Sequence, residues 1–136
     1  MDGALKLKEV AYLHAEEFPT GEILHGPLAL VDGKVVAFVI ATRDLTQPGS
    51  MQRYEKTISN MRTFKSRSGT VIALAHEGDE TVRTVADEVV PISRAAELLL
   101  PILEIVPLQL FAYHLATLLG KEVDRPRSLS KAVITD

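Results

Sequence analysis

Three side chains near the start of the chain could together carry acid–base chemistry: Lys6, Glu9 and His25. Lys6 and Glu9 stand at positions i and i+3, so in a helix their side chains meet on one face. His25 precedes Gly26 and Pro27, and this punctuation predicts a tight loop. A lysine, a carboxylate and an imidazole can transfer protons near neutral pH. Each of these residues also has a purely structural interpretation. Lys6 and Glu9 could form a surface ion pair, which contributes only about 0.2–0.5 kcal/mol to stability. His25 could be a loop residue that donates a hydrogen bond to a backbone carbonyl.

The length, composition and net charge of the chain exclude several classes of protein. The chain has 136 residues, 46% of them hydrophobic, which suits one domain with a buried core. Its net charge of −3 gives no basic surface for nucleic acid. It contains no cysteine, so a disulfide framework and a thiolate metal site are excluded. No cluster of metal ligands stands out, and we expect no metal and no cofactor.

No stretch predicts a membrane segment. The N-terminal sequence MDGALKLKEVAYL lacks the apolar core of a signal peptide. The longest apolar run, residues 98–119, is interrupted by Pro101, Glu104, Pro107, Gln109 and His114. We therefore expect a cytoplasmic domain that binds neither membrane nor nucleic acid.

Hydrophobic patterning predicts alternating helices and strands. The expected elements are a helix over 3–13, a strand over 34–40, a helix over 49–65, a strand over 70–75, a short strand over 87–91, and one or two helices over 94–119 with Pro101 and Pro107 as kinks or helix starts. The first two strands are apolar enough to be buried on both faces. This alternation predicts an α/β fold with a parallel sheet, helices on both faces, and ligands beyond the carboxyl ends of the strands.

Four blocks of sequence carry a resemblance to a known family: GALKLKE at 3–9, HAE at 14–16, GEILHGPLAL at 21–30 and PLQLFAYHLATLLGKEVDRPRSLSK at 107–131. In this order they resemble the second of two sugar isomerase (SIS) domains in the glucosamine-6-phosphate synthase family. The resemblance implies a three-layer αβα domain with a Rossmann-like parallel sheet over residues 1–136. Because the chain opens on a helix, we expect the first strand of that domain to be missing and the N-terminus to be truncated.

The resemblance also implies a chemistry. The family converts fructose 6-phosphate to glucosamine 6-phosphate with ammonia released from glutamine in a separate domain. The position of Lys131 forms a Schiff base with the sugar carbonyl, that of Glu9 moves a proton between C1 and C2, and that of Lys6 assists Glu9. The position of His25 opens the sugar ring in a neighbouring subunit's site, which implies a homodimer or higher oligomer. Ser130, with Lys131 and Glu9, would bind the substrate, and no cofactor or metal is implied.

Two departures leave other functions open. The tail reads Arg-Ser-Leu-Ser-Lys-Ala at 127–132 where the family typically has R-N-L-A-K-S, so an amino-sugar-phosphate deaminase or a deglycase is an alternative. The family's phosphate loop, S-x-S-G-x-T, belongs to the first SIS half, so we expect the isolated chain to have little or no activity. The first alternative from another class is a non-catalytic sugar-phosphate-binding regulatory module, although such a module would need neither Glu9 nor Lys131.

Other polar residues are interpreted as structural. The stretch Ser66 to Thr70 imitates the phosphate loop, but it follows a predicted helix and precedes a strand, so it predicts a helix end. His14 and His114 are interpreted as packing residues, and His76 as a solvated residue of an acidic loop.

Overall fold

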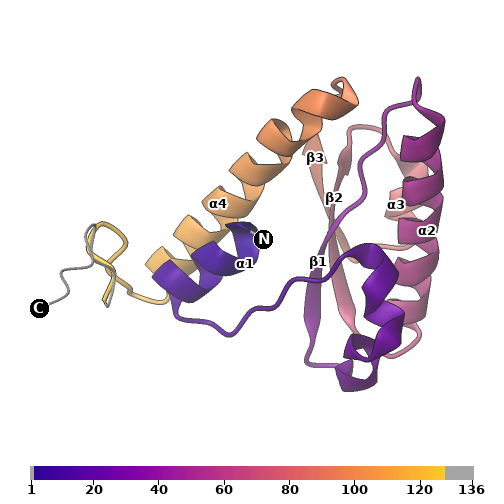
Figure 1. Ribbon diagram of the computed structural model, residues 1–136. Coiled ribbons are helices and arrows are strands. Elements are labelled where there is room, and N and C mark those ends of the chain that lie inside the picture. Colours follow the sequence, from indigo (N-terminus) through magenta and orange to yellow (C-terminus); the bar gives the residue numbers. More distant parts are fainter. Residues whose placement is uncertain (1, 128–136) are drawn as a thin grey trace, which may run out of the picture. The chain divides into compact units, whose positions relative to one another are not determined.

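The computed structural model describes residues 2–127, and the chain divides into two compact units (Figure 1). One unit comprises residues 18–104 and holds the sheet. The other comprises residues 1–17 together with the chain from residue 105 onward. The boundary falls within the last helix.

The described elements follow one another as α1 (Asp2–Lys6), a π-helical turn (Leu7–Ala11), two 3-10 helices (Thr20–His25 and Pro27–Leu30), β1 (Val36–Ile40), α2 (Pro48–Lys65), β2 (Thr70–His76), α3 (Glu80–Arg83), β3 (Glu88–Ile92), a 3-10 turn (Glu97–Leu99) and α4 (Leu100–Leu118). This order confirms the predicted α/β class.

The sheet has three parallel strands in the order β1-β2-β3. The central strand, β2, is buried along most of its length, as its apolar sequence predicts. The expectation that β1 is buried on both faces is wrong, because Val36 and Ile40 are 58% and 42% exposed. Within the described residues β1 pairs only with β2, so it is an edge strand.

Helix α2 covers the sheet with one apolar stripe. It begins at Pro48, whose fixed φ suits the first helical position. Tyr54, Ile58, Met61 and Phe64 are buried in the core, at the spacing of three and four that the sequence predicts. Their burial against β2 stabilises the unit that carries the sheet.

The stretch that imitates a phosphate loop is a helix end, as predicted. Helix α2 stops at Lys65, and the Ser66 hydroxyl donates to the Thr63 carbonyl at 2.7 Å. Ser68 then takes a left-handed φ of 66°, and β2 starts at Thr70. No helix N-terminus is available here to bind a phosphate.

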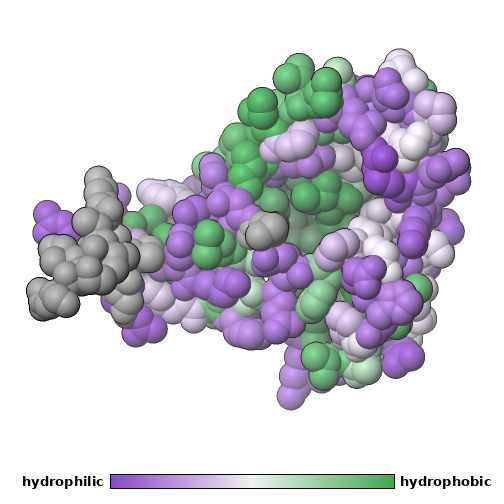
Figure 2. Space-filling model, viewed as in Figure 1, coloured by the Kyte–Doolittle hydropathy of each residue, from purple (hydrophilic) through white to green (hydrophobic). Residues whose placement is uncertain are grey.

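Helix α4 is long, apolar and largely exposed. Pro101 lies in its first turn, as predicted, while Pro107 lies inside the helix and does not begin a new one. Figure 2 shows hydrophobic side chains gathered over its start, where Leu98, Leu99 and Ile102 are 91%, 53% and 63% exposed. Among the described residues, Glu97–Leu118 is the one helical segment that reaches the length and mean hydropathy of a membrane span.

Substituting Gly69 tests the packing between α2 and β2. A Cβ at this position would lie 2.2 Å from Phe64 Cε1 and 2.8 Å from Val31 Cγ1. We expect Gly69→Ala to lower the free energy of unfolding by about 1–3 kcal/mol, as overpacked cores do. Urea unfolding monitored by circular dichroism would measure it.

Gly33→Ala is the matched control, because the nearest atom to its added Cβ is the Ser68 carbonyl oxygen at 3.9 Å. Its stability should stay within about 0.5 kcal/mol of the wild type. Equal stabilities of the two variants would contradict this packing.

Candidate functional site

The predicted pair of Lys6 and Glu9 is formed. Lys6 Nζ donates to Glu9 Oε2 at 2.8 Å, with the two side chains 37% and 22% exposed. The hydrogen bond to Glu9 raises the pKa of the Lys6 ammonium group, burial opposes this, and the charges of Glu9 and Asp2 add to the rise. Lys6 therefore stays protonated and holds the carboxylate in a fixed orientation.

Glu9 lies in an unusual piece of backbone. Residues Leu7–Ala11 form a π-helical turn directly after α1, and single π-helical turns are frequent at functional sites. The turn ends at Tyr12, which takes a left-handed φ of 58°. A tyrosine rarely adopts this conformation, which costs about 1–3 kcal/mol. The backbone is therefore strained at the end of the turn that carries Glu9, the candidate base.

Tyr12 also anchors the start of the tail. Its hydroxyl accepts a hydrogen bond from the Arg127 backbone nitrogen at 2.8 Å. The Arg127 guanidinium carbon stacks 4.1 Å from the centre of the Tyr12 ring, and Lys121 Nζ lies 5.9 Å from it. Arg127 precedes Lys131 by four residues in the sequence, and Tyr12 follows Glu9 by three. The anchor thus holds Arg127 against the residue that ends the π-helical turn carrying Glu9.

Of the other predicted site residues, His25 lies in the unit that carries the sheet, and Ser130 and Lys131 lie outside the described residues. His25 ends the 3-10 helix Thr20–His25 and is exposed, and its side chain has no hydrogen bond or ion pair to the described residues. The predicted turn after it is present, with Gly26 at a φ of 148°.

A second group of polar side chains lies at the carboxyl edge of the sheet, centred on Asp79. This carboxylate accepts from the Tyr54 hydroxyl at 2.8 and 2.9 Å and from the Val82 backbone nitrogen at 3.2 Å. Arg43 Nη2 lies 3.2 Å from it and the Arg43 guanidinium stacks 4.0 Å over the Tyr54 ring. Burial, followed by the hydrogen bond with Asp79, raises the pKa of Tyr54, so its hydroxyl remains a donor.

His76 belongs to the same group, and the prediction that it is solvated is wrong. It is the last residue of β2 and only 1% exposed. Its Nε2 lies 2.8 Å from the Arg43 carbonyl oxygen and 3.2 Å from the Arg43 backbone nitrogen. The predicted strand ended at residue 75, whereas β2 continues to His76 and places its ring in the interior. His14 and His114, predicted to pack, are exposed instead.

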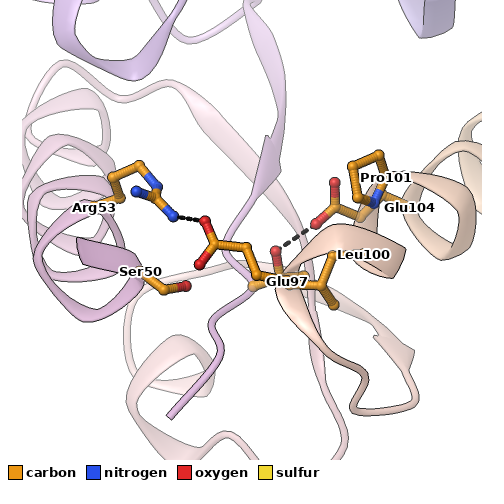
Figure 3. A pocket seen from close by; sticks show the side chains of 7 residues that line it. Ser50, Arg53, Glu97, Leu100, Pro101 and Glu104 are labelled. Atoms are coloured by element: carbon orange, nitrogen blue, oxygen red, sulfur yellow. Dashed lines mark hydrogen bonds and ion pairs between the residues drawn. The ribbon is translucent and has the colours of Figure 1, made fainter. Parts of the chain in front are cut away.

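A pocket of about 220 Å³ opens beside this network (Figure 3). Its walls come from the segment after β1, from the start of α2 and from the start of α4. The lining residues are Thr42, Ser50, Arg53, Glu97, Leu100, Pro101 and Glu104. No group of three or more metal-ligating side chains that could hold an ion occurs in the described part of the chain.

Sequence reasoning missed Tyr12, Arg43 and Asp79. A signal for Asp79 was present, because an aspartate after a strand and three residues before a helical Val82 is a helix N-cap. No local pattern marked Arg43 or Tyr12, since their partners are distant in the sequence.

The comparisons with known proteins decide the family. The family described as SIS domain matches residues 1–119. The chain belongs to the SIS domain family. This confirms the resemblance found in the sequence and the Rossmann-like α/β class it implied.

Curated relatives of this SIS chain are longer proteins. It is 47% identical to a glutamine–fructose-6-phosphate aminotransferase (isomerizing) of Chlorobaculum tepidum over 136 residues, 100% of this chain and 21% of that protein. It is 47% identical to the enzyme of the same name from Thermus thermophilus over 135 residues, 99% of this chain and 21% of that protein. The chain thus spans about a fifth of the length of these relatives.

Solved structures agree with the SIS fold. The C-terminal domain of a glucosamine-fructose-6-phosphate aminotransferase from Francisella tularensis superposes with a TM-score of 0.78 at 35% identity, covering 91% of this chain and 33% of that one. A protein assigned as a tagatose-6-phosphate ketose/aldose isomerase from Clostridium novyi gives a TM-score of 0.81 at 18% identity, covering 98% and 36%. The second likeness concerns the fold alone.

Removing the Glu9 carboxylate tests the coupling between Glu9 and Lys6. We expect the Lys6 ammonium group to titrate above its ordinary value of 10.5 in the wild type and to titrate lower in Glu9→Gln. The raised pKa means that the pair's stabilisation is fully present below about pH 10.5 and is lost as the pH rises through the folded-state pKa. Side-chain NMR of labelled lysine would measure the titration.

Glu16→Gln is the control for this titration, because it removes a carboxylate nearby in the sequence that pairs with His14 and not with Lys6. An unchanged Lys6 titration in Glu9→Gln would contradict the coupling.

Proposed function

We propose that this SIS domain is the C-terminal half of the isomerase region of an enzyme that makes glucosamine 6-phosphate from fructose 6-phosphate. The rest of such an enzyme would supply the first SIS half, with its phosphate loop, and ammonia from glutamine. The whole would act in the cytoplasm, with the apolar helix α4 as a helix of the domain. High identity to aminotransferases over the full chain supports this proposal.

The observation that carries the proposal is the arrangement around Glu9. The carboxylate is fixed by the Lys6 ammonium group and displayed on a π-helical turn. Arg127, held on Tyr12 just after that turn, leads into the segment with Lys131. Four residues of chain extend at most about 14 Å. A Schiff-base lysine and a carboxylate base on these two segments suit the same substrate.

The proposed chemistry follows from these residue types. The Lys131 amine adds to the sugar carbonyl and water leaves, which gives an iminium that acidifies the neighbouring C–H bond. Ammonia then adds to this iminium and expels the Lys131 amine, which leaves an iminium of ammonia on the sugar. Glu9 takes the proton from C1 and returns it at C2 as a positioned general base and acid. His25 would protonate and deprotonate the ring oxygen during opening, from a neighbouring subunit. Ser130 would contact the substrate beside Lys131.

Trapping the Schiff base tests the function. In the protein that joins this chain to a first SIS half and a glutaminase domain, borohydride with fructose 6-phosphate should attach the sugar covalently to Lys131. Lys131→Arg should abolish both labelling and turnover, because a guanidinium stays protonated. Peptide mass spectrometry would locate the label.

Lys34→Arg, at an exposed lysine outside the proposed site, should label and turn over as the wild type does. Label on another lysine would sink the mechanism. Ammonia release from glucosamine 6-phosphate without glutamine would favour a deaminase, and sugar-phosphate binding without turnover would favour a regulatory module.

We also propose that the domain self-associates through α4. The exposed apolar side chains Leu98 and Leu99 lie in the 3-10 turn before α4, and Ile102 lies in its first turn. Monomeric proteins rarely expose such patches without a partner. We expect Ile102→Glu to shift the sedimentation equilibrium toward monomer by at least about tenfold in dissociation constant, since a buried charge is costly.

Gln52→Glu, which adds the same charge at an exposed position of α2, should leave the equilibrium unchanged. A wild-type chain that sediments as a monomer at high concentration would refute the self-association.

A further inference from the structure

The pocket beside the carboxyl end of β1 lies where ligands of parallel α/β sheets bind. Thr42 follows β1 by two residues, and Ser50 and Arg53 come from the first turns of α2. Ligands in such folds sit beyond the carboxyl ends of the strands. None of the residues interpreted as catalytic lines this pocket. A ligand bound in it would therefore contact a different set of side chains.

The walls of the pocket are held in place by hydrogen bonds beneath it. The Asp44 backbone nitrogen donates to the Ser50 hydroxyl at 2.9 Å, and the Asp44 carboxylate accepts from the Glu97 backbone nitrogen at 3.0 Å. These two bonds join the segment after β1 to α2 and to the turn before α4. Arg43, the residue between Thr42 and Asp44, is fixed by Asp79 and Tyr54. The pocket is therefore pre-formed, and a ligand would not have to order its walls.

The charges in the pocket favour a cation. Arg53 forms an ion pair with Glu97, and the Thr42 hydroxyl donates to Glu104 (Figure 3). Two carboxylates and one guanidinium leave a formal charge of −1, with Glu104 having no cationic partner among the described residues. A phosphate would have to displace Glu97 from Arg53 and face Glu104. A primary ammonium group could instead donate to both carboxylates.

The other residues that line the pocket indicate what kind of molecule carries the cationic group. The hydroxyls of Thr42 and Ser50 and the unpaired N–H groups of Arg53 can bind ligand hydroxyls, while Leu100 and Pro101 give an apolar wall for a ring face. A volume of about 220 Å³ is below that of typical drug-sized sites and suits a molecule of one sugar ring. This combination of acceptors, donors and one apolar wall fits a polyhydroxylated amine.

We infer that this pocket is a binding site for a small polyhydroxylated primary amine, such as an aminohexose, whose ammonium group is held by Glu104 and Glu97. The site lies wholly within residues 18–104 and does not depend on the function proposed for Glu9 and Lys131.

Titration of the purified 136-residue chain with glucosamine, glucose and inorganic phosphate tests this inference. We expect glucosamine to bind, with NMR shifts centred on the Thr42 and Ser50 amides, and glucose to bind at least tenfold more weakly. We expect no binding of phosphate at these amides. Glu104→Gln should weaken glucosamine binding at least tenfold, because a charge-assisted hydrogen bond is lost.

Glu55→Gln is the matched control, since it removes the same charge from an exposed position of α2. Unchanged glucosamine affinity in a folded Glu104→Gln chain, shifts centred elsewhere, or no glucosamine binding by the wild type would overturn the site. Phosphate binding that is lost in Arg53→Gln would overturn it in favour of an anion site. If Glu104→Gln does not fold, Glu97→Gln takes its place, and it too should weaken glucosamine binding at least tenfold.

Discussion

The buried carboxylate of Asp79 is the constraint on which the sheet-bearing unit depends. Four groups converge on it or on its partners: the Tyr54 hydroxyl, the Val82 amide, the Arg43 guanidinium and, through the Arg43 backbone, the ring of His76. A carboxylate this deeply buried would be very costly without such partners. Its network joins α2 to the segments after β1 and β2, and so fixes the edge of the sheet where a ligand pocket opens.

The second unit is organised around a different local constraint, the strained backbone that carries Glu9. The π-helical turn and the left-handed Tyr12 display the carboxylate, and Lys6 keeps it oriented. Tyr12 adds the long-range part, because its ring and hydroxyl hold Arg127. Tyr12 thereby connects the turn that carries Glu9 to Arg127, more than a hundred residues further along the chain.

The two units thus carry different chemistry. The Glu9 segment holds a carboxylate oriented by an ammonium group, in a chain that belongs to the SIS domain family. The carboxyl edge of the sheet offers a polar pocket of net negative charge, suited to an amine. Within the sheet-bearing unit the same aspartate network both stabilises the fold and shapes the pocket, so structural and binding roles are not separable residue by residue.

The sequence by itself determined whatever depends on near neighbours. The apolar runs located β2 and α2, the i and i+3 spacing located the Lys6–Glu9 pair, and the Gly26 turn was evident because glycine tolerates positive φ. Only the tertiary structure decided that β1 is an edge strand, that His76 is buried, and that Arg43 meets Asp79 and Tyr12 meets Arg127. The physical reason is distance along the chain: local periodicity reports which face of an element is apolar, but not which remote element comes to cover it.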